Sequence, residues 1–280
     1  MRKPLGRLKQ AFARLVVGEA APHASALIPL RGPQVHFIAP TPLVTGADWH
    51  RLMEEDPGAV LERARAAAAS GDVTAQVVLA RMLATGTMGP ADPAAAFALA
   101  QAAAKSGQRE ALNLLGRCHE RGWGTPADSA RAIPLYRAAA DLGDPWAQFN
   151  LASLLFDGDG APCDRPAALV YFLRAARGGN PKAMNMLGRY CEEGWHRRRR
   201  PVAAAHWYRR SAEGGDFRGA FNHARILFAL GAREAALGWL ARAVEGGIPD
   251  FCRTVAADLE GHPDPDLAAL GRRARMRAGS

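Results

Sequence analysis

The stretch GDPWAQFNLASLLFDGDGAPCDRPAALVYFLRAARGG, residues 143–179, decides the fold because its landmarks return every 36 residues. Self-similarity at a fixed period of this length is the sequence signature of repeat proteins. Four positions of the period show it most clearly: Gly71, Gly107, Gly143, Gly179 and Gly215; Ala75, Ala111, Ala147 and Ala183; Leu79, Leu115, Leu151 and Leu187; Gly86, Gly122, Gly158 and Gly194.

Each period contains two stretches with helical periodicity. The first, residues 144–156 in the quoted unit, ends at the glycine-rich link 158–160, and the second covers residues 165–177. Large aromatic residues alternate with the small ones of the second stretch, and we expect Tyr171, Phe172, Trp207 and Tyr208 to fill the gaps between helices. The small residues recur at helical spacing: Ala96, Ala103 and Ala104; Ala132, Ala139 and Ala140; Ala168, Ala175 and Ala176.

The helix boundaries have a backbone reason. A helix commonly ends at a residue in the left-handed conformation, which glycine adopts without steric cost. The pairs Asp144-Pro145 and Asn180-Pro181 open the following helices, each with a capping side chain before a proline at the first helical position. One helical pair per 36 residues is therefore predicted.

Several segments resemble a Sel1-like repeat, a helical repeat related to the tetratricopeptide repeat. They are residues 147–152, 158–160 and 168–172 with Asp164, and residues 183–188 with Trp207-Tyr208. The resemblance implies an all-α solenoid and is specific for fold, not for function. Two loops depart from the pattern: residues 194–200 lack the acidic residue found at Asp92, Asp128 and Asp164, and the fifth unit has a loop four residues shorter. We expect the geometry to deviate at these two loops.

The chain is expected to divide into four parts. Residues 1–47 form a basic N-terminal helix and a proline-rich segment, and residues 48–71 form a leading half repeat whose helix begins after Asp56-Pro57. Residues 72–247 hold about five repeats, and residues 248–280 form two capping helices, 248–260 and 264–277. Solenoids need such caps because a terminal repeat otherwise exposes its apolar face.

Composition narrows the choice of partner. Lys and Arg number 36 against 27 Asp and Glu, a net charge of +9, which favours an acidic partner. The four cysteines form no CxxC pair and have no partner at metal-ligand spacing. Neither a secretory signal nor an apolar run of about 18 residues is found. We expect a cytoplasmic monomer with no cofactor or metal.

Arginine recurs at one position of the first helix of the repeat. Arg81, Arg117, Arg189 and Arg225 share this position, and Ser153 interrupts the column. The first helices line the concave surface of solenoids of this type, so the column suggests a ladder of donors for carboxylates. The alternative is a solvated face in which Glu120 and Glu192, three residues after Arg117 and Arg189, absorb two of the charges.

Two asparagines are further candidates. Asn150 and Asn222 precede the recurring leucine position, where the resemblance to tetratricopeptide repeats implies an asparagine that holds a peptide backbone. An asparagine there can also bond to its own scaffold. The loop 196–200 is the densest positive cluster and is either a solvated loop or a site for acidic groups.

The N-terminal residues 1–17 offer a different attachment. Apolar residues near helical spacing alternate there with arginine and lysine, so this segment either lies on an anionic membrane, docks on the first repeat, or is a basic tail. Nucleic acid is not favoured, because no aromatic residues interleave with the basic run and no known binding motif occurs.

No catalytic motif is found in the sequence. It contains no phosphate-binding glycine loop, nucleophile elbow or HExxH pair, and its histidines occur singly. The sequence thus predicts a non-enzymatic adaptor that holds an acidic peptide or protein in a concave groove. The alternatives are a membrane-associated regulator attached through residues 1–17 and an enzyme whose site forms only in three dimensions.

Overall fold

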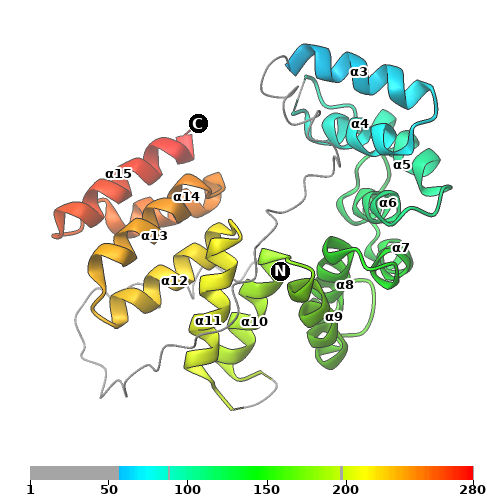
Figure 1. Ribbon diagram of the computed structural model, residues 1–280. Coiled ribbons are helices and arrows are strands. Elements are labelled where there is room, and N and C mark those ends of the chain that lie inside the picture. The colour runs from blue at the N-terminus through cyan, green and yellow to red at the C-terminus, as the bar shows by residue number, and fades with distance from the viewer. Residues whose placement is uncertain (1–56, 88, 196–197, 280) are drawn as a thin grey trace. The chain divides into compact units, whose positions relative to one another are not determined.

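The computed structural model describes residues 57–87, 89–195 and 198–279, and this part of the chain contains thirteen α-helices and no strand (Figure 1). The predicted all-α fold is confirmed. The helices are α3 (Pro57–Ala69), α4 (Val73–Thr85), α5 (Pro93–Ala104), α6 (Arg109–Arg121), α7 (Ser129–Asp141), α8 (Pro145–Asp157), α9 (Arg165–Arg177), α10 (Pro181–Glu193), α11 (Pro201–Glu213), α12 (Phe217–Ala229), α13 (Arg233–Glu245), α14 (Pro249–Leu259) and α15 (Pro265–Gly279).

The helices pack as consecutive pairs, one pair for each predicted repeat. The first members are α4, α6, α8, α10 and α12, and each packs most extensively on the helix that follows it. Helix α3 packs on α4, while α15 packs on both α13 and α14. The protein is therefore a helical-pair solenoid, with α3 before the first pair and α14 and α15 after the last.

The chain divides into two compact units at the junction of Asn180 and Pro181. The N-terminal unit contains α3–α9, and buried alanines such as Ala100 and Ala111 let its helices approach closely. The C-terminal unit contains α10–α15, and its core is richer in large residues such as Phe221 and Phe251. Each unit has its own core.

The glycine columns occupy the backbone conformation that the sequence predicted. All five glycines from Gly71 to Gly215 have φ between 73° and 91°, and all four from Gly86 to Gly194 have φ between 67° and 73°. A side chain is strained at such values, which explains why glycine recurs there. In these two columns the left-handed glycine lies at the end of a helix or just after it and turns the chain toward the next helix.

Aspartates cap most of the helix starts. Asp144 accepts from the backbone N–H groups of Trp146 and Ala147 at 2.7 and 2.8 Å, and Asp92 and Asp164 cap α5 and α9 in the same way. Each cap satisfies backbone donors that have no partner within the helix.

The two unusual loops can be compared with the regular ones at their helix ends. Arg200 replaces the capping aspartate before α11, yet its φ of −133° and ψ of 77° match the −131° and 82° of Asp164. At the cap position the backbone therefore matches that of the other units and the side-chain cap is lost, while His196 and Arg197 of the same loop lie outside the described residues. In the fifth unit α12 ends at Ala229, its cap residue Leu230 is not left-handed, and the left-handed glycine follows at Gly231 with φ of 76°. Helix α13 begins after Ala232 without a side-chain cap.

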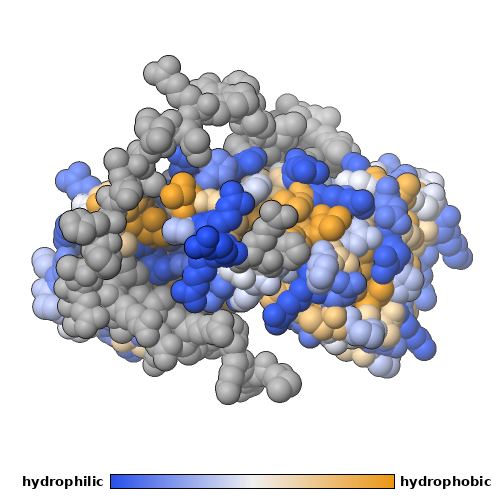
Figure 2. All heavy atoms as spheres, turned by 90° about the horizontal axis from the view of Figure 1, so that it is seen from below, coloured by the Kyte–Doolittle hydropathy of each residue, from blue (hydrophilic) through white to orange (hydrophobic). Residues whose placement is uncertain are grey.

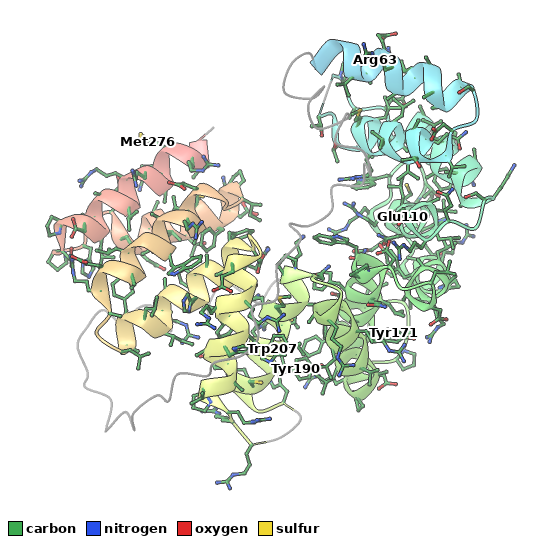
Figure 3. All side chains as sticks on the ribbon, in the orientation of Figure 1. Arg63, Glu110, Tyr171, Tyr190, Trp207 and Met276 are labelled. Atoms are coloured by element: carbon green, nitrogen blue, oxygen red, sulfur yellow. The ribbon has the colours of Figure 1, made fainter. Side chains whose placement is uncertain are left out.

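The aromatic residues divide between core and surface. Phe172 and Tyr208 are completely buried, as expected. Tyr171 and Trp207 are only half-buried (Figure 3), so the prediction that they fill the core is wrong for these two. Each of these two rings contacts an arginine side chain instead. The Cζ atom of Arg174 lies 5.5 Å from the ring centre of Tyr171, and that of Arg210 lies 5.3 Å from the ring centre of Trp207.

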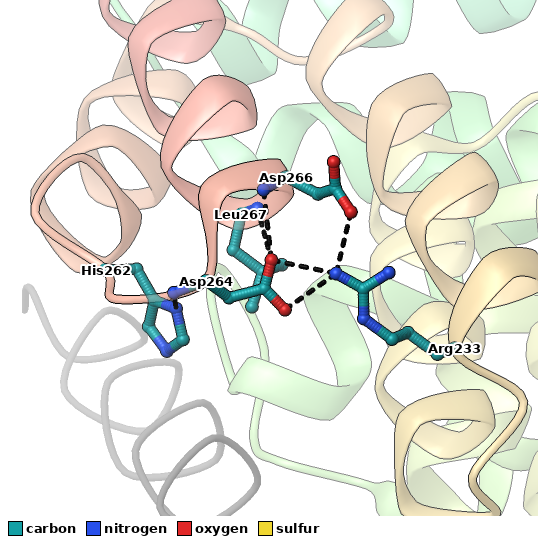
Figure 4. A network of polar contacts seen from close by, with 5 residues as sticks. All are labelled: Arg233, His262, Asp264, Asp266 and Leu267. Carbon is teal, nitrogen blue, oxygen red and sulfur yellow. Dashed lines mark hydrogen bonds and ion pairs between the residues drawn. The ribbon is translucent and has the colours of Figure 1, made fainter.

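A cluster of ion pairs joins α13 to the last helix, α15. The Arg233 Nη2 atom donates to both carboxylate oxygens of Asp264 at 2.8 Å and to Asp266 at 2.7 Å (Figure 4). The Arg233 guanidinium lowers the pKa of Asp264. This cluster ties the start of α13 to the start of α15.

Part of the sequence analysis falls outside the described residues. The basic segment 1–17, the proline-rich segment that follows it, residues 48–56 and the loop residues His196 and Arg197 are not among those described. No helix within the described ranges has the length and apolar character needed to cross a bilayer.

Candidate functional site: two arginine–tryptophan pairs

The four arginines of the column lie where the sequence placed them, on the first helices of their pairs. Arg81 and Arg117 are on α4 and α6 of the N-terminal unit, and Arg189 and Arg225 are on α10 and α12 of the C-terminal unit. All four side chains are half-buried, in keeping with a position that is neither core nor fully solvated.

Two of these arginines stack on a tryptophan from the loop that follows their helix. The Cζ atom of Arg117 lies 4.8 Å from the ring centre of Trp123, and that of Arg189 lies 5.0 Å from the ring centre of Trp195. Stacking holds a guanidinium in one orientation through the ring's negative face. We call these the first and second arginine–tryptophan pairs.

The neighbouring glutamates do not neutralise the stacked arginines. Glu120 instead accepts a 2.5 Å hydrogen bond from the Tyr136 hydroxyl and pairs with Arg121 at 3.0 Å. The alternative in which Glu120 absorbs the charge of Arg117 is therefore wrong in this structure. Within the described part of the chain, no carboxylate forms an ion pair with Arg117.

In the second pair, too, the neighbouring glutamate does not neutralise the stacked arginine, but here the glutamate pairs with an arginine of another helical pair. Glu192 accepts a 2.7 Å hydrogen bond from the Tyr208 hydroxyl and forms an ion pair with Arg225 of the next helical pair. Arg189 contacts the Met186 sulfur at 3.5 Å and has no carboxylate partner among the described residues. Arg225 is thus already paired with a carboxylate of the protein, and its predicted role in binding stays a prediction.

Arg81 lies beside the first pair. Burial lowers the pKa of its guanidinium, and repulsion from Arg117 lowers it further. No side chain in the described residues forms an ion pair or hydrogen bond with this guanidinium. Two guanidinium groups therefore lie close enough to repel each other without a shared carboxylate, and an added anion would relieve that repulsion.

The two predicted asparagines bond to their own scaffold. Asn150 donates to the side chain of Asn113 at 3.0 Å, and Asn222 donates to that of Asn185 at 2.9 Å. Asn113 and Asn185 are buried, so each amide pair links two successive first helices. The structure thus shows a scaffold role for both asparagines and leaves peptide binding as a prediction.

A glycine allows each tyrosine to approach the helix that carries the arginine. A β-carbon at Gly116 would lie 2.7 Å from the Tyr136 ring, and one at Gly188 would lie 2.5 Å from the Tyr208 ring. Both tyrosines are completely buried. Glycine is therefore required for the close packing that brings each hydroxyl to its glutamate.

The sequence analysis missed that these residues form two copies of one arrangement. Every member of the first copy recurs 72 residues later, at twice the repeat length. A search at the double period would have found them, because the single period places other residue types between the copies. The corresponding residues are Asn113 and Asn185, Gly116 and Gly188, Arg117 and Arg189, Glu120 and Glu192, Trp123 and Trp195, Tyr136 and Tyr208, and Asn150 and Asn222.

No group of three or more metal-ligating side chains occurs among the described residues. A hollow of about 180 Å³ between α13 and α15 is lined mainly by Val244, Glu245, Leu270, Arg273 and Met276, without a histidine, cysteine or serine. Figure 2 shows hydrophobic side chains in small groups separated by hydrophilic ones on the face in view.

Comparisons with known proteins agree with this fold. The sequence model of the Sel1 repeat matches residues 73–108, 109–144, 147–180 and 181–216, about half of the chain. The helical pair α12–α13 lies beyond the matched residues. No curated protein matches the chain.

The solved structures that resemble the protein include the following three. A Sel1 repeat protein from Oxalobacter formigenes has a TM-score of 0.66 and 22% identity, over 82% of this chain and 98% of its own. The protective antigen c5321 of uropathogenic Escherichia coli has a TM-score of 0.59 and 25% identity, over 81% of this chain and 52% of its own. The immunity protein Pa5087 from Pseudomonas aeruginosa has a TM-score of 0.54 and 17% identity, over 74% of this chain and 80% of its own.

Proposed function

Because the chain belongs to the Sel1 repeat family, whose members are generally protein–protein interaction scaffolds, we propose that it is a non-enzymatic adaptor that binds an acidic peptide or protein surface. One observation carries the proposal. Arg81, Arg117 and Arg189 are half-buried at one position of the repeat, and none of them has a carboxylate partner among the described residues.

The chemistry of the site favours a carboxylate ligand. A guanidinium offers a planar set of donors that matches the two oxygens of a carboxylate. The guanidinium groups of Arg117 and Arg189 lie over the Trp123 and Trp195 rings, and their N–H donors form no ion pair with a carboxylate of the described residues. Because the orientation is set before binding, less side-chain entropy is lost when the ligand arrives.

The net charge of +9 supports the same choice of partner. A positive surface attracts an acidic partner over a distance of about 10 Å at moderate salt, which raises the rate of encounter. At short range, the half-buried arginines then form hydrogen bonds and ion pairs with the carboxylates of the partner. Binding of this kind weakens as salt concentration rises.

The test is affinity capture from the native cell with the wild-type chain and with the Arg117→Glu, Arg189→Glu double variant. We expect an acidic protein, identified by mass spectrometry, to be captured by the wild type and lost with the double variant. A matched control is the Arg65→Glu, Arg253→Glu variant, which reverses one exposed arginine in each unit. Capture of the same proteins by all three chains would contradict the proposal.

A further inference from the structure

The two copies of the arginine–tryptophan arrangement imply more than one ligand site. The first copy lies entirely on α6–α8 of the N-terminal unit, and the second lies entirely on α10–α12 of the C-terminal unit. The contacts are the same in both: guanidinium on indole, tyrosine hydroxyl on glutamate, and asparagine on asparagine. Neither copy borrows a residue from the other.

We propose that the protein has two separate carboxylate-binding sites of one design, one at each arginine–tryptophan pair, and that its partner presents two acidic segments. The proposal rests on the proposed function and specifies its ligand further. Two sites joined by a folded chain bind a partner with two matching segments more tightly than either site alone, because the second contact forms within one complex.

The repeated features are the ones that prepare an arginine for a ligand. Other residues can fill the interior at the position of Gly116 and Gly188: Ala152 and Ala224 occupy it in the repeats that follow, and both are buried. Packing of the repeats alone therefore does not require the residues that the two copies share. Trp123 and Trp195 lie in the loops after α6 and α10, where each is half-buried: Trp123 packs against a core cluster and Trp195 contacts the buried Tyr190. Both indoles are also placed over a guanidinium, which packing against the core does not require. In both copies the tyrosine also holds the nearby glutamate, which keeps that carboxylate from pairing with the stacked arginine.

The two sites differ in strength. Arg81 adds a second unpaired guanidinium beside Arg117 within the N-terminal unit. In the C-terminal unit the other arginine of the column is Arg225, which is engaged by Glu192. We expect the first site to bind a carboxylate about fivefold more tightly than the second, the worth of one additional partly exposed ion pair.

Each site contains its own reporter, so the two can be observed separately. The indole N–H signals of Trp123 and Trp195 would be followed by NMR during titration with an acetylated, amidated Glu-Glu dipeptide, which is too short to serve as two segments. A Gln-Gln dipeptide is the control ligand. We expect both signals to shift with Glu-Glu and neither with Gln-Gln.

Single variants separate the sites. Arg117→Gln should abolish the response of Trp123 and leave that of Trp195, and Arg189→Gln should do the reverse. Arg81→Gln should weaken the first site about fivefold, to the strength of the second. Helicity of each variant is checked by circular dichroism, and Arg65→Gln and Arg253→Gln serve as controls.

The outcomes distinguish this inference from the proposed function. A response of Trp123 alone in the wild type, or the loss of both responses in Arg117→Gln, would overturn the two-site inference while leaving acidic binding in place. No response at either tryptophan would contradict both.

Discussion

Helices α6–α8 and α10–α12 are built on one plan, and comparing them shows which residues the plan needs. The packing glycine, the buried tyrosine, the glutamate and the stacked arginine are the same in both. The residues that differ lie around this set: Leu151 corresponds to His223, Ser153 to Arg225, and Asp128 to Arg200. The shared residues hold the arginine in place, and the differing ones change stability and local charge.

The largest expected effect comes from filling the glycine position. Gly188→Ala should destabilise the protein by about 3 kcal/mol, because the new β-carbon overlaps the buried Tyr208 ring and moves its hydroxyl away from Glu192. Gly116→Ala should have a similar effect. Chemical denaturation measures both.

Gly238→Ala is the matched control, because a β-carbon at this helical glycine meets no atom within 4 Å. It should stabilise the protein by about 0.5–1 kcal/mol through helix propensity. Equal effects at Gly188 and Gly238 would refute the packing explanation.

The second effect depends on pH and belongs to the C-terminal copy. His223 occupies the position of the buried Leu151, against Trp239, and its Nδ1 atom is buried without a hydrogen-bond partner. Burial, with a contribution from the Arg209 charge, lowers its pKa from 6.5 to about 4. The unfolded chain therefore binds this proton at a higher pH than the folded one does.

It follows that stability should fall as the pH drops from about 6.5 to about 4, by about 2 kcal/mol from this residue. His223→Leu should remove that part of the pH dependence, and Leu151→His should add a second such slope in the N-terminal copy. Melting temperatures across this pH range test both. An unchanged slope in His223→Leu would show that the proton binds elsewhere.

A third, smaller effect concerns the ion pair found in one copy only. Arg225→Ser should cost about 1–2 kcal/mol, because it leaves the half-buried Glu192 with Tyr208 as its hydrogen-bond partner. It should also weaken carboxylate binding at Arg189, since the released charge of Glu192 lies nearby. Arg253→Ser, which removes an exposed pair, should change stability by less than about 0.5 kcal/mol.

The smallest effect restores a cap. Arg200 has the backbone angles of the capping aspartates but no capping hydrogen bond, so Arg200→Asp should stabilise the protein by about 1 kcal/mol. Arg199→Asp, at the residue before the cap position, should give a smaller gain. Thermal melting compares the two, and equal gains would point to net charge instead of capping.

Much of the fold follows directly from the sequence. Glycine is strongly favoured at positive φ, so the two glycine columns, to which Gly107 and Gly122 belong, indicate both the period and the helix ends. The predicted helix over residues 165–177 coincides with α9. Backbone requirements of this kind depend only on the residue and its neighbours, so they can be predicted locally.

The site was less predictable because its contacts join residues far apart in the chain. Glu192 lies one helical turn from Arg189 in sequence, yet it pairs with Arg225, 33 residues away. The 36-residue register placed Arg225 in the column correctly and could not show where its side chain points. Trp123 and Trp195 do not form a column at the 36-residue period, because the one repeat between them has Asp159 at that position.

The most direct test of the account is calorimetric titration of the wild-type chain with a short oligoglutamate peptide at low and moderate salt. Parallel titrations use the Arg117→Glu, Arg189→Glu double variant and an oligoglutamine peptide. The account predicts binding of oligoglutamate to the wild type that weakens with salt, no binding to the double variant, and none of oligoglutamine to either chain. Equal binding of oligoglutamate to both chains, with the variant still folded, would contradict the claim that the stacked arginines form the site.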